Sequence, residues 1–377
     1  MKVLLVDPFV SGHHVLYAKK IINYLIKNNV EVSFMTSEKF SEELNINVIK
    51  LPEKKYKCKS FNKINEAIYY DKILELIEKN NIDIVHLLYL DNQSIPLILA
   101  IDKLNKISKK AKLIGTIHWY SNIIGYNGLK RKIKTLLFKY LKNKFALFFV
   151  HGQKNKDMLI KTLNLNECKI ATIPYGANRF IEVDKESCRK VLHINQEEKV
   201  ILLFGAIRDD KGIDILVRST KYLVEEITIL IAGKVNEFVD LVKSLSSHEN
   251  VTLRLYDRFI KEDEIQTFYG ASDVVVLPYK KTFTGQSGPL ALATQFGTPV
   301  IGTEVGEIGM TIRQNNLGIV IEPEKPKQLA NAINKFFSIS NAELSLYKEN
   351  LIKYNLANLW DVMSEHIYNY YCKIVKS

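Results

Sequence analysis

Two basic residues in the second half of the chain are placed to bind a diphosphate. In the segment 202–216, "LLFGAIRDDKGIDIL", Arg208 and Lys211 lie between an apolar run typical of a buried strand and the start of an expected helix. A helix N-terminus offers unpaired N–H groups and a positive dipole end, and cations beside it favour the same anion. The alternative is a solvated turn, in which Asp209 and Asp210 partly neutralise the basic pair.

A second segment, 282–302, reads "TFTGQSGPLALATQFGTPVIG" and runs from small residues into an apolar helix. Ser287 is expected to cap this helix, and Pro289 fits its first turn. Gly285 and Gly288 would let a ligand approach the unpaired N–H groups. The segment therefore predicts a second phosphate-binding element, and the alternative is an ordinary capped helix whose glycines serve only the turn. It contains no glutamate.

Histidines mark two strand ends in the first half of the chain. Gly12, His13 and His14 lie at an expected strand-to-helix turn, and His118 follows another apolar run in "IGTIHWY". A single histidine at a strand end is more often structural, so the pattern alone gives His118 no role. No Asp-x-Asp pair follows a strand and the histidines lack ligand spacing, so no metal site is predicted.

The segment 128–144, "GLKRKIKTLLFKYLKNK", combines an apolar helical face with basic residues and no acid. The apolar face consists of Leu129, Ile133, Leu136, Leu137, Tyr140 and Leu141. The basic residues are Lys130, Arg131, Lys132, Lys134, Lys139, Lys142 and Lys144. One interpretation is a core-packed helix with a solvated lysine face, and the other is a face that rests on anionic lipid.

Strands and helices alternate in two series, which predicts two doubly wound parallel sheets facing a cleft. The expected strands are Lys2–Val6, Glu31–Met35, Val48–Leu51, Ile84–Leu88, Leu113–Ile117 and Leu147–Val150, then Lys199–Phe204, Ile227–Ala232, Thr252–Leu255, Val274–Leu277, Pro299–Gly302 and Gly318–Ile321. The pattern lapses over 175–196, which places the junction of two α/β domains there. The tail from Leu359 is expected to form one more amphipathic helix.

Composition restricts the class of protein. A chain of 377 residues exceeds one ordinary core, and 47% hydrophobic with 25% charged residues describes a globular protein. No apolar run approaches the roughly 20 residues of a membrane span, and the start of the chain does not read as a signal peptide. Four scattered cysteines fit a reducing cytoplasm. The net charge of +12 implies an anionic partner, although no nucleic-acid recognition motif is present.

Seven motifs in series resemble the retaining glycosyltransferases of family 4, of the bacterial polysaccharide and lipopolysaccharide type. They are "VHGQKNKDML", "IPYGANRF", "LLFGAIRDDKGIDIL", "ILIAGKV", "ASDVVVLPY", "SGPLALATQFGTPVIGTEVGEIGMTI" and "LGIVIEPEKPKQLANAI". The resemblance implies the GT-B fold of two Rossmann-like domains. It assigns 1–178 to acceptor binding and 179–355 to the nucleotide sugar, with 356–377 as a helix packing back toward the first domain.

The resemblance also implies roles for residues. Arg208 and Lys211 correspond to ligands of the donor diphosphate, and His118 to a histidine that contacts the donor sugar and takes part in catalysis. The donor-binding set comprises Gly12, Gly205, Arg208, Lys211, Thr284, Gly285, Ser287 and Gly288. The acceptor or membrane set comprises His13, His14, Lys130, Arg131, Lys132 and Lys134.

The chain departs from the family where many members carry two glutamates, because these positions are Thr284 and Leu292. An arginine often found after the first glycine is Ala206. We therefore expect a variant site with donor contacts shifted toward backbone N–H groups and the hydroxyls of Thr284 and Ser287.

The expected protein is a metal-independent glycosyltransferase without a cofactor. It would transfer a sugar from a nucleotide sugar to a saccharide acceptor, lipid-linked in our interpretation, at the cytoplasmic face of the inner membrane, and it would not bind nucleic acid. A non-catalytic GT-B subunit that partners an active enzyme is the main alternative. Other GT-B enzymes, such as sugar-nucleotide epimerases, match the motifs of the second half less well.

Overall fold

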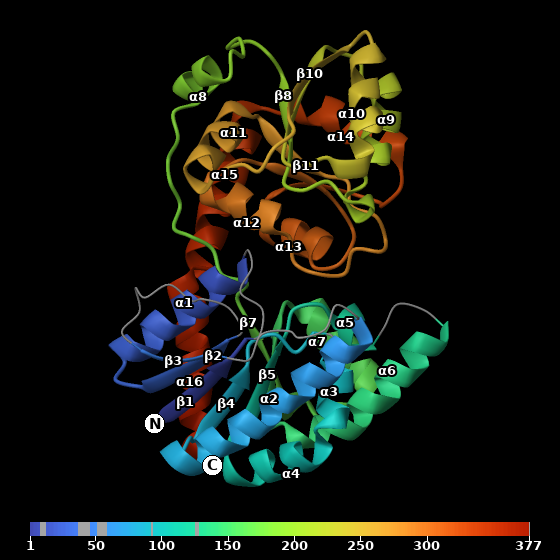
Figure 1. The fold of residues 1–377 in the computed structure, drawn as a ribbon. Coiled ribbons are helices and arrows are strands. Elements are labelled where there is room, and N and C mark those ends of the chain that lie inside the picture. The colour runs from blue at the N-terminus through green and yellow to red at the C-terminus, as the bar shows by residue number, and fades with distance from the viewer. Residues whose placement is uncertain (8–12, 37–45, 51–58, 92, 125–127, 377) are drawn as a thin grey trace. The chain divides into compact units, whose positions relative to one another are not determined.

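The computed structural model describes residues 1–7, 13–36, 46–50, 59–91, 93–124 and 128–376. The chain divides into two compact units (Figure 1). Unit 1 comprises Met1–Gly176 and Trp360–Ser377, and unit 2 comprises Ala177–Leu359.

Unit 1 contains a seven-stranded sheet in the order β3-β2-β1-β4-β5-β6-β7, and each neighbouring pair is parallel. Its strands are β1 (Lys2–Val6), β2 (Glu31–Thr36), β3 (Asn47–Lys50), β4 (Ile84–Leu87), β5 (Lys112–Ile117), β6 (Leu147–His151) and β7 (Ile170–Ile173). The strands are short runs of apolar residues because helices cover both faces of the sheet. The chain reverses its direction of winding between β1 and β4, where sheets of this kind bind ligands beyond the carboxyl ends of the strands.

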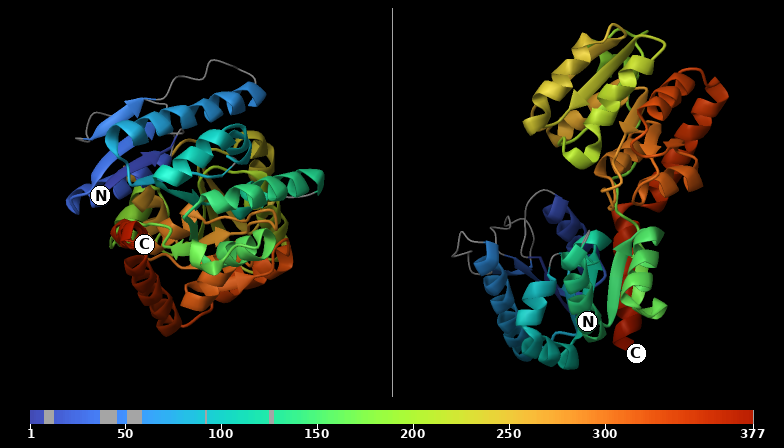
Figure 2. Two further views of the ribbon diagram at one scale, coloured as in Figure 1. Left: turned by 90° about the horizontal axis from the view of Figure 1, so that it is seen from below. Right: turned by 90° about the vertical axis from the view of Figure 1, so that its right-hand side faces the viewer.

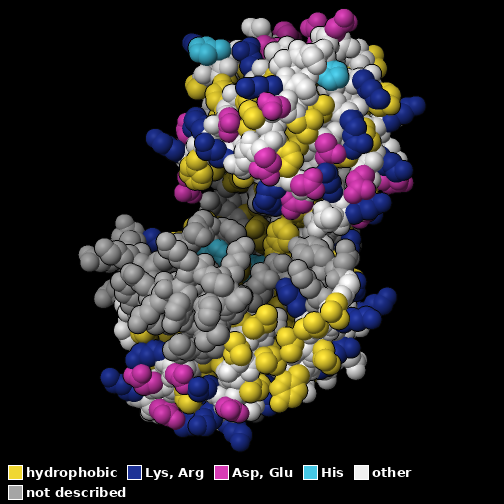
Figure 3. Space-filling view, turned by 45° about the vertical axis from the view of Figure 1, so that its right-hand side comes forward, with side chains coloured by type: hydrophobic (Ala, Val, Ile, Leu, Met, Phe, Trp, Pro, Cys, Tyr) yellow, Lys and Arg dark blue, Asp and Glu magenta, His cyan; other side chains and the backbone are white. Residues whose placement is uncertain are grey.

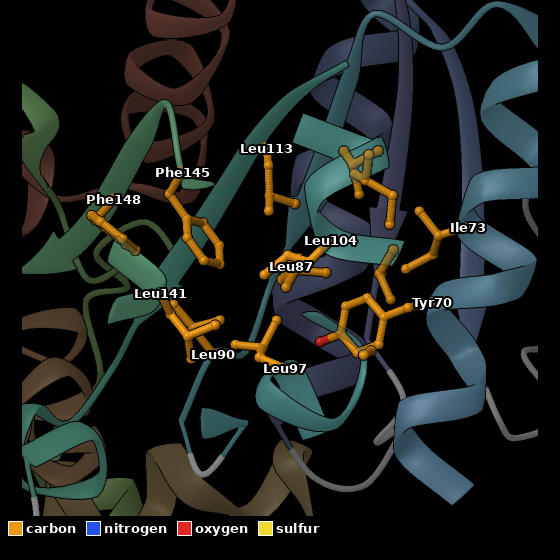
Figure 4. Close-up of a cluster of buried hydrophobic side chains, with 14 of the residues drawn as sticks. Tyr70, Ile73, Leu87, Leu90, Leu97, Leu104, Leu113, Leu141, Phe145 and Phe148 are labelled. Atoms are coloured by element: carbon orange, nitrogen blue, oxygen red, sulfur yellow. The ribbon is translucent and has the colours of Figure 1, made fainter. Parts of the chain in front are cut away.

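Helices cover the sheet of unit 1 in two layers. Their bounds are α1 (His13–Lys27), α2 (Lys59–Asn80), α3 (Ser94–Leu99), α4 (Ile101–Lys110), α5 (Tyr120–Ile124), α6 (Gly128–Leu141), α7 (Gln153–Leu163) and α16 (Trp360–Lys376). One buried cluster joins the sheet to α2, α3, α4 and α6, and includes Leu97, Leu104 and Leu141 (Figure 4). A second cluster joins the opposite face to α1 and α16 (Figure 2).

Unit 2 contains a six-stranded parallel sheet in the order β10-β9-β8-β11-β12-β13. Its strands are β8 (Val200–Phe204), β9 (Ile227–Ala232), β10 (Val251–Tyr256), β11 (Val274–Leu277), β12 (Val300–Thr303) and β13 (Gly318–Ile321). Its helices are α8 (Lys185–Val191), α9 (Ile213–Ser219), α10 (Val239–Lys243), α11 (Ile265–Ala271), α12 (Gly288–Gln295), α13 (Ile308–Asn315), α14 (Pro326–Phe336) and α15 (Asn341–Ala357). Here the winding reverses between β8 and β11, so their following loops share one edge of the sheet.

The expected fold class is confirmed, since both units are doubly wound parallel sheets. The sequence pattern missed β7, whose four residues "IATI" form a run too short and too mixed to stand out beside the longer apolar strands. The C-terminal helix α16 belongs to unit 1, where Met363, Ile367 and Tyr371 are buried against α1 and the sheet. The predicted strand at Val48–Leu51 ends outside the described residues.

The chain leaves unit 1 after Gly176 and returns to it at Trp360. In unit 1 the indole of Trp360 packs directly on Gly176. In unit 2 the N–H of Ala177 donates to the carbonyl of Asn358 at 2.9 Å, and the buried amide of Asn355 donates to the carbonyl of Asn178 at 2.9 Å. The outgoing and returning segments are therefore fastened together in each unit.

Gly176 is expected to tolerate no side chain. Its φ is +90°, and a Cβ would lie 2.2 Å from the Trp360 ring. Gly176→Ala combines backbone strain of about 1–2 kcal/mol with displacement of the indole, so we expect the free energy of unfolding to fall by more than about 2 kcal/mol. Urea denaturation measures the loss. Gly128→Ala is the control, because Gly128 has φ +61° and open space around its Cβ position. Equal losses in both variants would contradict the packing role of Trp360.

Candidate functional site

The loops after β8 and β11 are packed against each other at the carboxyl edge of the sheet in unit 2. At Gly212, with φ +70°, a Cβ would lie 2.0 Å from the carbonyl oxygen of Pro278. The N–H of Lys280 donates to the carbonyl of Asp210 at 3.0 Å. The first loop begins at Gly205, where φ is +91° and the N–H donates to the carbonyl of Ala232 at 2.8 Å. The two segments selected from the sequence are therefore parts of one site.

Arg208 is exposed and is paired with an acid of its own loop. Its Nε and Nη2 donate to the two carboxylate oxygens of Asp210, at 3.1 and 3.0 Å. The sequence had suggested that acids partly neutralise this loop, and the structure shows how. Lys280 pairs with Asp209 at 2.6 Å and with Asp214 at 3.0 Å. Lys280 is thus a third cation at this edge, which the sequence analysis did not select.

Lys211, in contrast, is buried, with 7% of its surface exposed. It ends the short 3₁₀ turn Asp209–Lys211, and its Nζ donates to the hydroxyl of Tyr279. The same Nζ lies 4.2 Å from the centre of the Tyr279 ring and 6.0 Å from that of Phe283, a cation–π arrangement. Burial, and secondly the charge of Arg208, lowers the pKa of Lys211 to about 7.

The turn before α12 has the geometry of a ligand-binding helix start. Ser287 is the N-cap residue, and its Oγ accepts from the N–H of Leu290 at 3.3 Å, with Pro289 in the first turn. Tyr279 Oη lies 3.2 Å from Ser287 Oγ, so Lys211 and the cap are joined through one tyrosine. A Cβ at Gly288 would meet no atom within 4 Å, so there is open space over this helix start.

A buried carboxylate lies on the loop that follows the neighbouring strand β12. Glu307 is 1% exposed and precedes α13. The preceding Gly306 packs on the turn at Thr284 and Gly285, because its Cβ would lie 2.9 Å from the Gly285 carbonyl oxygen. Leu292 and Thr284, the positions of the missing glutamates, carry no charge. Glu307 is not among the residues predicted from the sequence, although an acid between two glycines after an apolar run is an available signal.

Histidine and tyrosine rings form a stack at the carboxyl ends of β1, β4 and β5 in unit 1. Tyr89 lies between His14 and His118, at centroid distances of 3.6 and 3.8 Å. His14 Nδ1 is 2.9 Å from a carboxylate oxygen of the buried Asp7. His118 is buried, and its Nε2 donates to the carbonyl of Leu88 at 3.0 Å.

The sequence selected both histidines of this stack but missed its other members. Asp7, directly after β1, was a visible signal, whereas nothing in the pattern distinguished Tyr89. Asp91 accepts from the N–H groups of His118 and Trp119, at 3.0 and 2.8 Å, which fixes the turn after β5. Gly12 lies outside the described residues, and the side chain of His13 is not described.

The lysine-rich helix α6 exposes much of its apolar face. Leu129 and Leu136 are 72% and 70% exposed, and Ile133 and Tyr140 are also exposed. The core-packed interpretation is therefore wrong for these residues. Leu141, which the pattern placed on the same face, is buried, because it packs with Phe138 into the core of unit 1.

Helix α3 extends this apolar surface. It packs against α6 and adds Ile95 and Leu99, both exposed (Figure 3). We call the exposed side chains of Ile95, Leu99, Leu129, Ile133, Leu136 and Tyr140 the α3–α6 patch. Arg131, Lys132 and Lys139 on α6 are also exposed, and Lys134 is half-buried; the Lys130 side chain is not described.

Two absences concern the part of the chain that the structure describes. No group of three or more histidine, cysteine, aspartate or glutamate residues could hold a metal ion within that part. Among its helices, none has the length and apolar composition required to cross a bilayer.

Two doubly wound parallel units, with cations and a capped helix at the carboxyl edge of the second, define the GT-B class of fold. Residues 15–179 match the family described as Glycosyltransferase Family 4, and residues 184–354 match Glycosyl transferases group 1. Each unit of the chain thus matches one glycosyltransferase domain family, and the two matches together span most of the chain.

Curated relatives are similar over part of their length. An uncharacterized glycosyltransferase of Methanocaldococcus jannaschii is 26% identical over 57% of this chain and 57% of its own. A D-inositol 3-phosphate glycosyltransferase of Rhodococcus opacus is 25% identical over 49% of this chain and 44% of its own. The chain thus spans about half the length of these relatives.

Solved structures share the fold over nearly the whole chain. Anabaena HepE in complex with UDP has a TM-score of 0.74 at 15% identity, covering 99% of this chain and 100% of that one. A glycosyltransferase of Rickettsia africae has a TM-score of 0.77 at 20% identity, covering 100% and 99%.

The buried ammonium of Lys211 should destabilise the unliganded protein at low pH. Its folded pKa of about 7 lies below the unfolded value, so between about pH 7 and 10 the unfolded state binds more protons. The contribution of this lysine to stability then rises with pH by up to about 1.4 kcal/mol per unit. We expect Lys211→Met to be more stable than the wild type at pH 6, and the difference to shrink from pH 7 to pH 9.

Urea denaturation at these pH values measures both proteins. Lys234→Met, at an exposed lysine of the same unit, is the control and should show a constant difference. A constant difference for Lys211→Met as well would contradict the burial of a charged lysine.

Proposed function

We propose that the protein transfers a sugar from a nucleotide sugar to a saccharide acceptor, without a metal ion and with retention of configuration. The observation that carries this proposal is the joined site of unit 2, where Arg208, Lys211 and the Ser287-capped start of α12 share one sheet edge. The domain matches support it, and so does the fold shared with HepE, which was solved with UDP and with UDP-glucose.

The chemistry requires positive charge at the departing diphosphate. Negative charge builds on the nucleotide as its bond to the sugar breaks, and preorganised cations and N–H groups stabilise it most in the transition state. In a metal-independent enzyme the protein must supply that charge, and Arg208 and Lys211 are the residues we assign. Asp210 already pairs with Nε and Nη2 of Arg208, so a phosphate would exchange with, or share, an existing carboxylate contact.

The missing glutamates require other contacts to the sugar and the ribose. The Thr284 hydroxyl and the backbone around Gly285 remain the substitutes expected from the sequence. Glu307 adds a carboxylate on the loop packed against that turn, and we propose that it takes over one of the two roles.

In unit 1, His14 is assigned to the acceptor, and His118 keeps the role implied by the resemblance, contact with the donor sugar. Tyr89 packs against the half-buried His14 ring and holds it in place, and Asp7 can hold His14 in one tautomer.

Removal of both cations should abolish sugar transfer while leaving the fold intact. In Arg208→Ala, Lys211→Ala we expect donor turnover to fall by at least about 100-fold, the scale for one preorganised contact. UDP, GDP, ADP and CMP are first compared by thermal shift, because a ligand at 100 times its Kd adds about 2.7 kcal/mol of stability. Sugar release from the matching nucleotide sugar is then measured with and without acceptor.

Arg218→Ala is the matched control for this experiment, since Arg218 is an exposed arginine of α9 paired with Asp214 at 2.9 Å. It should keep full turnover. Near-normal turnover in the folded double variant would overturn the assignment. If the wild type binds a nucleotide but releases no sugar, the protein is the non-catalytic subunit instead, an alternative that the absence of both glutamates favours.

We further propose that the α3–α6 patch rests on anionic lipid and brings unit 1 to a lipid-linked acceptor at the inner face of the cytoplasmic membrane. Exposed apolar side chains beside exposed lysines and arginines are what an interfacial helix requires. Each nearby basic residue contributes about 1 kcal/mol of attraction to an anionic surface. Attraction of this kind acts over about 8–10 Å and weakens with salt.

Vesicles containing anionic lipid should therefore bind the protein at low ionic strength, and neutral vesicles should bind it weakly. Reversal of two charges, Arg131→Glu and Lys132→Glu, should reduce binding by at least about 10-fold, since two contributions of about 1 kcal/mol are lost. Leu129→Ser with Leu136→Ser should reduce it independently of salt. Sedimentation with vesicles measures both effects.

Phe259→Ser serves as the control, because Phe259 of unit 2 is as exposed as Leu129 but lies outside the α3–α6 patch. Donor hydrolysis should persist in every one of these variants. Equal partition of the wild type and the two patch variants onto anionic vesicles would leave the lysines as solvated surface.

A further inference from the structure

One buried hydroxyl links the two anion-binding elements of unit 2. Tyr279 is fully buried, lies two residues after the end of β11, and has its carbonyl held by the Thr303 hydroxyl at 2.8 Å. Its Oη accepts from Lys211 Nζ and lies 3.2 Å from Ser287 Oγ. Tyr279 is not among the site residues predicted from the sequence.

Counting protons gives this chain of hydrogen bonds a direction. An ammonium group only donates, so the Tyr279 oxygen accepts from charged Lys211, and Ser287 Oγ is within reach as an acceptor for the Tyr279 O–H. Ser287 Oγ then accepts twice, from Tyr279 and from the N–H of Leu290 at 3.3 Å. Its own proton remains available to donate, and a phosphate oxygen is a suitable acceptor.

The direction reverses when Lys211 loses its charge. A neutral amine has a lone pair, so it can accept from the Tyr279 hydroxyl, which leaves the Tyr279 oxygen to accept from Ser287. The serine proton is then used inside the protein. One deprotonation therefore removes both the cation and a hydroxyl donor from the place where an anion would bind.

The charged groups around Lys211 allow both states near neutral pH. Arg208 disfavours the ammonium and Asp210 favours it, but burial is the largest influence and places the pKa at about 7. From the second loop, Tyr279 and Phe283 face Lys211 with uncharged rings. Lys280, on the same loop, is occupied by Asp209 and Asp214.

We propose that Tyr279 is a positioning residue that couples the charge of Lys211 to the direction of the Ser287 hydroxyl. The site then offers both donors to a diphosphate only when Lys211 is protonated. The role of the diphosphate rests on the proposed function, whereas the coupling of the three side chains stands on the geometry of unit 2.

Calorimetric titration with UDP, GDP and ADP between pH 6 and 9 tests the proposal. The wild type should take up protons on binding the diphosphate that it prefers, and its affinity should fall as pH rises through 7. Tyr279→Phe should bind about 10-fold more weakly at pH 6.5, and its affinity should begin to fall at a lower pH than that of the wild type, because the ammonium loses its accepting oxygen. Ser287→Ala alone should weaken binding of the diphosphate. When it is combined with Tyr279→Phe, binding should be little weaker than in Tyr279→Phe alone.

Tyr269→Phe is the matched control. Tyr269 is another fully buried tyrosine of unit 2, and its hydroxyl donates to the carbonyl of Pro289 at 3.1 Å, beside the same helix start. It makes no bond to Lys211, so its loss should leave the pH profile unchanged. Thermal melts establish that each variant is folded, and Ser287→Ala tests the coupling from the other end if Tyr279→Phe is unstable.

A measurement without ligand tests the coupling of the three side chains separately from the role of the diphosphate. NMR titration of the Lys211 side chain should show a lower pKa in Tyr279→Phe than in the wild type and in Tyr269→Phe. The positioning role would be overturned if Tyr279→Phe bound the diphosphate with the affinity and pH profile of the wild type. It would also be overturned if the pKa of Lys211 were the same in Tyr279→Phe as in the wild type. If none of the three diphosphates binds the wild type, the proposed function fails, and the diphosphate role of Tyr279 fails with it.

Discussion

The close approach of Gly212 to the carbonyl of Pro278 is the contact on which the site of unit 2 depends. Any side chain at Gly212 would drive the loops after β8 and β11 apart, because its Cβ would lie 2.0 Å from that oxygen. With the loops in contact, Lys211 lies under the ring of Tyr279, and the cap of α12 is within hydrogen-bond distance of the same tyrosine. Without this contact, Lys211 and Ser287, which are 76 positions apart in the sequence, would have no shared partner.

The arrangement sacrifices stability for electrostatic strength. A lysine in water would be fully charged and weakly interacting, whereas a lysine removed from water acts strongly on any anion that reaches it. The cost is a depressed pKa, which burial imposes and Tyr279 limits by accepting a hydrogen bond. With a buried lysine at such a site, the folded protein is less stable than it would be with an apolar residue at the same position. A ligand that pairs with the lysine can recover part of this free energy on binding.

The sequence was informative where local rules dominate. Apolar runs locate the strands, with β7 as the exception, and capping chemistry identifies Ser287 as an N-cap residue. Arg208 and Lys211 were selected by type and position, but their environments differ because one side chain is exposed and the other is buried. Burial depends on which loops meet, and so do the roles of Tyr279 and Glu307, which come from other segments of the chain. Periodicity also placed Leu129 and Leu141 on one face, yet only the packing of α6 decided which of them enters the core.

Helix α16 has a consequence for biosynthesis. It buries Met363, Ile367 and Tyr371 in the core of unit 1, and the Tyr371 hydroxyl lies 2.5 Å from Nδ1 of the buried His86 on β4. The ribosome makes this helix only after the whole of unit 2, so unit 1 emerges first but lacks one wall of its core. Unit 2 is continuous in sequence and can fold as soon as it is released. The first half of the chain must meanwhile persist with an apolar sheet face that only α1 covers, which is the period when chaperones and aggregation compete for it.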